Sequence, residues 1–194
     1  MKKLIVLCVA AVAALGSPAS ASTITVTAPT TVNSSFDVTV TAQDLFDGRD
    51  ILTDIIISSG FQVDISTPGV FAFVGATSGP LFDTATTEPG TDVFSAAIGQ
   101  SGFGIEPGAT EPLILATLHF AVIGPGSANI VISSDLTNLF QGLQYFNAPF
   151  QEPIAGSVSV TARAAAVPEP STLVLVGAGL AGLVRRFLTA SKRR

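Results

Sequence analysis

The central part of the chain alternates apolar and polar residues with a period of two over several short stretches. In residues 36–43, the apolar Phe36, Val38, Val40 and Ala42 are each followed by a polar residue. This alternation is typical of a β-strand with one face in the core and the other in solvent. Similar alternation, or a short apolar run, predicts further strands at 24–27, 61–66, 70–76, 93–98, 114–122, 128–133 and 157–162.

The longest stripe runs through residues 114–122, where every second residue from Ile114 to Val122 is apolar and is predicted to face the core. Thr117 and His119 of this strand are then expected on the outer face, because successive side chains of a strand point to opposite sides. No stretch between Ser22 and Ala166 shows helical periodicity. The pattern therefore predicts an all-β domain.

Turn signals separate the predicted strands. Proline fixes φ and glycine tolerates positive φ, so each Pro-Gly pair predicts a turn. Eight or nine short strands joined in this way favour a β-sandwich or jelly roll over residues 22–163. A domain of this length can bury a core without disulfide bonds. The pairs are Pro68-Gly69, Pro89-Gly90, Pro107-Gly108 and Pro125-Gly126.

The N-terminal residues have the organisation of a secretory signal peptide. A positive start, Met1-Lys2-Lys3, precedes the apolar run 4–15, and Ala19 and Ala21 form the small-x-small pattern that signal peptidase cleaves. Cleavage is predicted after Ala21, so that residues 1–21 are removed and the mature chain begins at Ser22. The alternative is a buried N-terminal helix, which the length and flanks of the run do not favour.

The C-terminal residues predict a short transmembrane helix over 172–188 and a basic cytoplasmic tail over 189–194. Residues 172–184 are uncharged, although a full helical span needs about 20 residues. The basic cluster is expected to stay cytoplasmic, because basic flanks of membrane segments remain inside. The residues of this basic anchor are Arg185, Arg186, Lys192, Arg193 and Arg194.

A linker over 164–171 precedes this helix and contains Pro168-Glu169-Pro170. The two prolines keep the backbone out of a helix and leave an extended, accessible peptide. This motif, the apolar segment and the basic end together resemble the PEP-CTERM sorting signal of Gram-negative bacteria. The resemblance implies an exported protein processed by an exosortase, a membrane-embedded enzyme. The alternative is a generic C-terminal anchor.

The two ends agree on one topology, with residues 22 to about 166 outside the membrane and the tail inside. We therefore expect an intermediate anchored in the inner membrane, followed by delivery to the cell surface or the medium.

The exported part resembles cohesin-like domains, which also occur on other proteins with PEP-CTERM tails. The resemblance rests on the order of patterned strands in four segments: 23–40, 60–64, 115–120 and 156–160. It implies a nine-stranded sandwich of jelly-roll type that serves as a protein-docking module. No dockerin-facing residue can be identified from the sequence, so dockerin binding does not follow.

Charge and composition exclude several classes of function. The whole chain has a formal net charge of −5, but residues 22–166 hold thirteen acidic and two basic residues, a net charge of −11. This balance argues against binding nucleic acid. The single Cys and single His cannot build a zinc site or a disulfide framework.

Four aspartates close together, Asp44, Asp47, Asp50 and Asp54, are the only candidate metal ligands. Carboxylates on a loop can bind Ca²⁺, although the EF-hand spacing is absent. An acidic loop in contact with solvent is the favoured interpretation, and no other cofactor is expected.

The sequence offers little for catalysis. A hydrolase would need His119 within a triad, or Glu106 and Glu111 facing each other across a cleft. We therefore expect a non-enzymatic module for adhesion or scaffolding in the envelope or the extracellular matrix of a biofilm.

The main alternative function is a carbohydrate-binding module for exopolysaccharide. It requires Phe140, Tyr145, Phe146 and Phe150 to form an exposed aromatic strip rather than part of the core.

Overall fold

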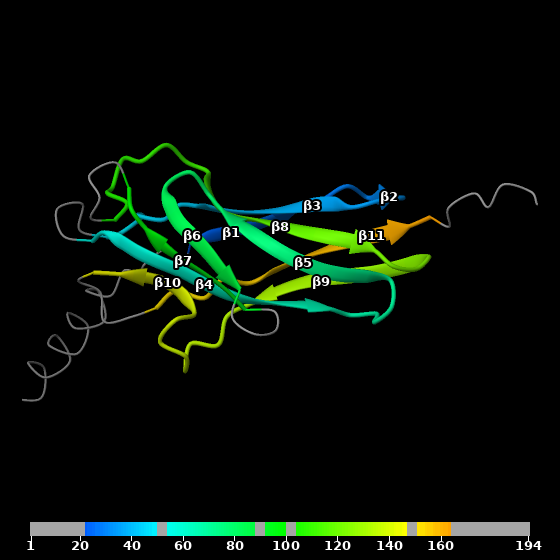
Figure 1. Ribbon diagram of the computed structural model, residues 1–194. Helices are drawn as coiled ribbons and strands as arrows, with labels where there is room; N and C mark the ends of the chain where they lie inside the picture. The colour runs from blue at the N-terminus through cyan, green and yellow to red at the C-terminus, as the bar shows by residue number, and fades with distance from the viewer. Residues whose placement is uncertain (1–21, 50–53, 88–91, 100–103, 147–150, 164–194) are drawn as a thin grey trace, which may run out of the picture. The chain divides into compact units, whose positions relative to one another are not determined.

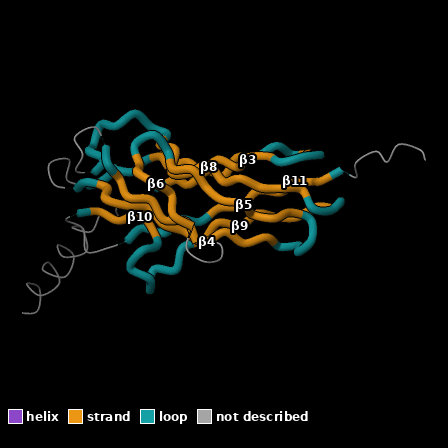
Figure 2. The backbone as a smooth tube through the Cα atoms, viewed as in Figure 1, coloured by secondary structure: helices purple, strands orange, loops and turns teal. Residues whose placement is uncertain are grey.

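The computed structural model describes residues 22–49, 54–87, 92–99, 104–146 and 151–163. The chain divides into two compact units, Met1–Arg163 and Ala164–Arg194. The described part contains strands and loops without a helix (Figures 1 and 2). Its strands are β1 (Thr23–Thr27), β2 (Thr31–Val32), β3 (Phe36–Gln43), β4 (Ile56–Ile65), β5 (Phe71–Ser78), β6 (Phe82–Thr87), β7 (Asp92–Ala97), β8 (Leu113–Val122), β9 (Gly126–Ser133), β10 (Gly142–Tyr145) and β11 (Gly156–Ala162).

Several sequence predictions concern segments outside the described residues. They are the signal peptide 1–21, the linker 164–171, the helix 172–188 and the basic tail 189–194. Within the described part of the chain, no helix is long and apolar enough to cross a membrane.

The strands form two stacked sheets, as predicted for an all-β sandwich (Figure 1). The four-stranded sheet has the order β1-β3-β8-β5 and is antiparallel throughout. The seven-stranded sheet has the order β2-β11-β9-β4-β7-β6, and β10 pairs with β4 outside this path. Only the β2–β11 pair is parallel among the described strands.

The core lies between the sheets and follows the predicted alternation. Phe36 of β3 stacks on Phe120 of β8 with ring centroids 5.4 Å apart, and it meets Phe71 of β5 edge-on at 5.0 Å. On the facing sheet, Phe61 of β4 and Ile130 of β9 are also buried in this core. The sandwich thus has a core of its own, without disulfide bonds in the described residues.

The predicted stripe on β8 is wrong at its first residue. Ile114 is 39% exposed, whereas its neighbours Leu113 and Leu115 are buried. The register explains this difference: Val40 pairs with Ala116 but Thr41 pairs with Ile114, so Leu115 is left as the extra residue of a β-bulge. A bulge reverses the inward and outward order of the residues before it.

Candidate functional site

Residues 134–141, which connect β9 to β10, form a loop whose large apolar side chains lie in solvent. Leu139 is 76% exposed and Phe140 is 65% exposed, and Leu136 is also exposed. An exposed side chain of this size forgoes about 1.5 to 3 kcal/mol of burial free energy. Grouped apolar exposure of this kind marks surfaces that meet other molecules. We call residues 134–141 the Phe140 loop.

The Phe140 loop is held in place by its own polar side chains. The Asp135 carboxylate accepts hydrogen bonds from the Thr137 hydroxyl at 2.7 Å and the Thr137 N–H at 2.9 Å, and these bonds lower the pKa of Asp135. Asn138 Oδ1 accepts from the Phe140 N–H at 3.0 Å, and Gln141 Oε1 accepts from the Asp135 N–H at 2.6 Å. A loop ordered in advance loses less conformational entropy when it binds a partner.

The loop also packs closely on the seven-stranded sheet. Gly60 of β4 permits this approach, because a Cβ at that position would lie only 1.9 Å from the carbonyl oxygen of Phe140. The Phe140 ring meets Phe94 of β7 edge-on, with centroids 5.7 Å apart and an interplanar angle of 87°. The backbone of the loop is therefore seated on the sheet, while most of the Phe140 side chain stays in solvent.

A second group of contacts, which the sequence did not predict, holds residues 44–49 after β3. Arg49 forms an ion pair with Glu152, and both side chains are nearly nine-tenths buried. The guanidinium carbon of Arg49 lies 3.5 Å from the centroid of the Tyr145 ring. The Tyr145 hydroxyl donates a hydrogen bond to the Leu45 carbonyl at 2.8 Å. We call Arg49, Tyr145 and Glu152 the Arg49 latch.

Charges around the Arg49 latch act on Tyr145. Burial raises the pKa of the Tyr145 phenol, the Glu152 carboxylate raises it further, and Arg49 opposes them. The sequence did contain a signal for this group, because Arg49 is one of only two basic residues between 22 and 166. Either of two basic residues among thirteen acidic ones has many acids with which to pair.

The predicted calcium ligands do not gather within the described residues. Asp44 accepts a hydrogen bond from the Thr23 hydroxyl at 3.0 Å, Asp47 is exposed, and Asp50 lies outside the described part. No three His, Cys, Asp or Glu side chains come together there as a possible metal site. With Asp50 outside the described part, the calcium site stays a prediction.

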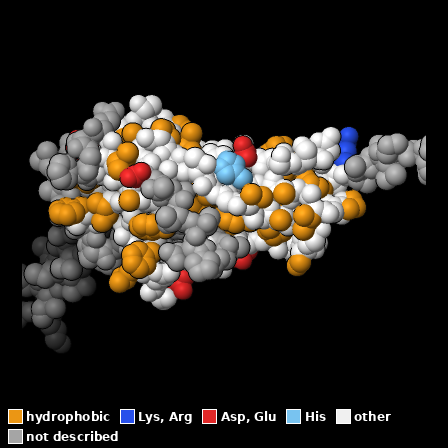
Figure 3. Space-filling view, viewed as in Figure 1, with side chains coloured by type: hydrophobic (Ala, Val, Ile, Leu, Met, Phe, Trp, Pro, Cys, Tyr) orange, Lys and Arg blue, Asp and Glu red, His pale blue; other side chains and the backbone are white. Residues whose placement is uncertain are grey.

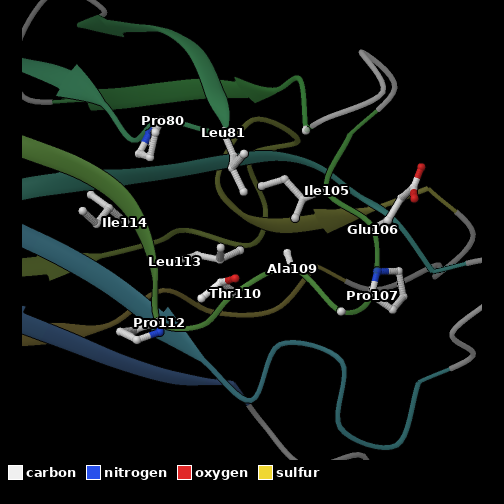
Figure 4. Close-up of a pocket in the computed structure, with 12 residues that line it drawn as sticks. Pro80, Leu81, Ile105, Glu106, Pro107, Ala109, Thr110, Pro112, Leu113 and Ile114 are labelled. Atoms are coloured by element: carbon white, nitrogen blue, oxygen red, sulfur yellow. The ribbon is translucent and has the colours of Figure 1, made fainter.

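Of Glu106 and Glu111, only Glu106 is among the residues that line the pocket found in the described part of the chain. The Glu111 carboxylate accepts hydrogen bonds from the backbone N–H groups of Asp44 and Leu45, at 2.8 and 3.1 Å. Glu106 instead lines a pocket of about 390 Å³ beside Leu81 (Figure 4). The pocket walls are mainly apolar, and they come from Pro80, Leu81, Ile105, Pro107, Pro112 and Leu113 among others.

His119 lies on the outer face of β8, as predicted, and is not among the residues that line the pocket. Its Nδ1 atom lies 2.8 Å from Asp37 Oδ1, and its Nε2 atom lies 2.8 Å from Thr77 Oγ1. The sequence could not reveal these contacts, because Asp37 and Thr77 come from β3 and β5, the strands on either side of β8.

The aromatic strip that carbohydrate binding requires is only partly present. Tyr145 is 4% exposed and belongs to the Arg49 latch, whereas Phe140 and Phe146 are exposed. Phe150 lies outside the described residues.

Comparison with protein families matches residues 166–186 to the PEP-CTERM protein-sorting motif. The chain carries a PEP-CTERM sorting motif. The matched segment contains Pro168-Glu169-Pro170 and extends to Arg186, which confirms the resemblance inferred from the sequence. A motif of this kind implies export and a sorting signal anchored in the membrane at the C-terminus. No curated protein matches the chain.

Among solved structures, the sandwich is similar to cohesin modules. A cohesin module from a family 33 glycoside hydrolase of Clostridium perfringens aligns with 74% of this chain and 96% of its own, with a TM-score of 0.50 and 16% identity. A non-cellulosomal cohesin from Archaeoglobus fulgidus aligns with 75% and 93%, with a TM-score of 0.40 and 14% identity. The first likeness confirms the predicted cohesin-like fold.

Proposed function

We propose that this chain is an exported protein whose sandwich binds a partner protein through the Phe140 loop, as an adhesion or scaffolding module. The observation that carries the proposal is the exposure of Leu139 and Phe140 on a loop already held by hydrogen bonds. An apolar, preordered surface of this kind is typical of binding hot spots. The role is one of binding, without catalysis.

The position of the end of β11 supports partner binding at the Phe140 loop. Gly156, at the start of β11, pairs with Ile132 just before the Phe140 loop, whereas Ala162, at the end of β11, pairs with Gly126. The length of β11 therefore separates the loop from the exit to the tail by roughly 20 Å. Figure 1 shows β10 and the end of β11 at opposite ends of the sandwich. A partner at the loop would therefore lie at the other end of the sandwich from Ala162.

The PEP-CTERM sorting motif supports a route of export followed by processing at the membrane. We propose that exosortase acts near Pro168-Glu169-Pro170 on an intermediate in the inner membrane of a Gram-negative cell, and that the protein then reaches the cell surface or the medium. There the module would join components of the envelope or of a biofilm matrix.

The test of partner binding uses the full chain produced in its own cells and crosslinked in intact cells. The variant L139S/F140S removes the apolar surface of the Phe140 loop. Val74, which is 68% exposed on the other sheet, provides the matched control V74S. We expect capture of one defined partner to fall about tenfold in the loop variant and to be unchanged in V74S, which corresponds to 1.4 kcal/mol. Equal capture by wild type and both variants would overturn the proposal, provided that their melting midpoints agree.

A further inference from the structure

The outer face of the four-stranded sheet carries threonine hydroxyls in register. Thr27 of β1 pairs with Thr39 of β3, Thr39 pairs with Thr117 of β8, and Thr117 pairs with Thr77 of β5. One threonine from each strand thus forms a continuous row across the whole sheet. This row belongs to the sheet opposite the one that carries the Phe140 loop.

Two shorter rows on β1 and β3 extend the pattern. Thr25 pairs with Thr41, two residues along from Thr27 and Thr39, and Thr23 pairs with Gln43, a further two residues along. Adjacent strands of a sheet lie about 4.8 Å apart, and residues two apart along one strand lie about 6.7 Å apart, so these threonines repeat at about these spacings. We call these seven threonines the threonine face. They are Thr23, Thr25, Thr27, Thr39, Thr41, Thr77 and Thr117.

The threonine face carries few charged side chains. Asp37 lies 2.8 Å from His119 Nδ1, Asp44 at the end of β3 accepts a hydrogen bond from the Thr23 hydroxyl, and neither Arg49 nor Arg163 belongs to these four strands. Figure 3 shows the pale blue histidine beside an acidic side chain, with white uncharged surface next to them. Most of the −11 net charge therefore lies elsewhere.

At Thr77 the row meets a chain of hydrogen bonds that runs through His119 to Asp37. These contacts determine which of the three side chains donate and which accept. A carboxylate only accepts, so in the neutral imidazole the Nδ1–H of His119 donates to Asp37, and the Thr77 hydroxyl donates to Nε2. The Thr77 oxygen can then accept a hydrogen bond from a ligand. Because both nitrogens of His119 have partners, the ring is held before any ligand binds.

We propose that the threonine face binds a neutral polysaccharide, independently of the Phe140 loop. A neutral glycan repeats hydroxyl groups that both donate and accept, which matches a repeated array of threonine hydroxyls. Each such hydrogen bond contributes only about 0.5 to 1.5 kcal/mol, so a single sugar gains little. A polymer that engages several rows gains by multivalency. An acidic polymer is repelled by the negative charge of the exported part.

The test measures retention of the full chain, kept in mild detergent, on insoluble cellulose, chitin and β-1,3-glucan, and on calcium-free alginate beads as the acidic polymer. The variant T39V/T117V keeps the shape of the centre of the row and removes two hydroxyls. Thr161, exposed on β11 of the other sheet, gives the matched control T161V. We expect retention on at least one neutral polymer to fall about tenfold in T39V/T117V and to be unchanged in T161V and L139S/F140S.

A rescue variant separates the hydroxyls from the fold. T39S/T117S keeps both hydroxyl groups, and it should restore retention even if its melting midpoint falls. Retention on none of the neutral polymers, stronger retention on alginate, or equal loss in T161V would each overturn the proposal. It would also be overturned if the face instead joined two copies of the chain, seen as a dimer in analytical ultracentrifugation that T39V/T117V abolishes.

Discussion

The guanidinium carbon of Arg49 lies 3.5 Å from the centroid of the Tyr145 ring, so an arginine from the loop after β3 covers an aromatic ring of β10. The same tyrosine donates its hydroxyl to the Leu45 carbonyl. One side chain of the seven-stranded sheet therefore fixes the loop that leaves the four-stranded sheet.

Replacing Tyr145 by Phe tests this connection. The ring and its contact with Arg49 remain, but the carbonyl of the buried Leu45 residue loses its hydroxyl partner. We expect the free energy of unfolding to fall by about 1 to 3 kcal/mol, the cost of an unsatisfied buried polar group. Chemical denaturation of the full chain in detergent measures this change. A difference within 0.3 kcal/mol of zero, about the scatter of such comparisons, would contradict it.

The Arg49–Glu152 ion pair predicts a strongly non-additive pair of substitutions. R49M leaves the Glu152 carboxylate buried without its cation, and we expect a loss of about 3 to 5 kcal/mol. R49M/E152Q removes the isolated charge and should be more stable than R49M alone. Denaturation of both variants provides the comparison, and a double variant no more stable than the single would rule out the pairing as described.

The hydrogen bonds to Asp135 make the order of the Phe140 loop depend on pH. Because the folded-state pKa of Asp135 is lowered, its contribution is present above the unfolded pKa and is lost as pH falls through the folded pKa. T137V removes the hydroxyl donor and should raise the pKa of Asp135 toward its ordinary value. T137S keeps the donor and is the control. NMR titration of the Asp135 carboxyl group measures the shift, and equal midpoints for wild type and T137V would disprove it.

Gly60 predicts a variant that alters the Phe140 loop without touching its surface residues. In G60A, the new Cβ would lie 1.9 Å from the Phe140 carbonyl oxygen, so the loop must move. We expect a loss of about 1 to 3 kcal/mol of stability, together with weaker partner capture. Thermal melting and the crosslinking assay test the two effects. Wild-type behaviour in both would show that the loop does not depend on this close approach.

The sequence predicted the fold correctly where the pattern within a single strand is enough to define that strand and its buried face. The period-two stripe of residues 36–43 predicted β3 and its buried face. Pro68-Gly69 and Pro107-Gly108 lie in loops between described strands, and Gly126 of the Pro125-Gly126 pair begins β9. The sequence was less reliable where pairing with a neighbouring strand determines which side chains are exposed. The exposure of Ile114 depends on a bulge opposite Thr41, which no pattern within β8 reveals.

Short or mixed segments were also missed. β10 has only four residues, and β6 carries threonines and an aspartate rather than a clear alternation, so neither gave a periodic signal. The contacts of His119 and Arg49 join residues between 42 and 103 positions apart, and only the paired sheets bring them together.

Fractionation of cells tests most directly whether residues 166–186 sort the exported sandwich. The full chain carries an epitope after Ser22, and Pro168, Glu169 and Pro170 are replaced together by Ala. These residues lie outside the sandwich, so its stability should not change.

We expect the wild type at the cell surface or in the medium in a shortened form. The triple variant should still be exported but remain in the inner membrane at greater length. If both proteins reach the same fraction in equal amounts and at equal size, the Pro168-Glu169-Pro170 motif does not sort this chain.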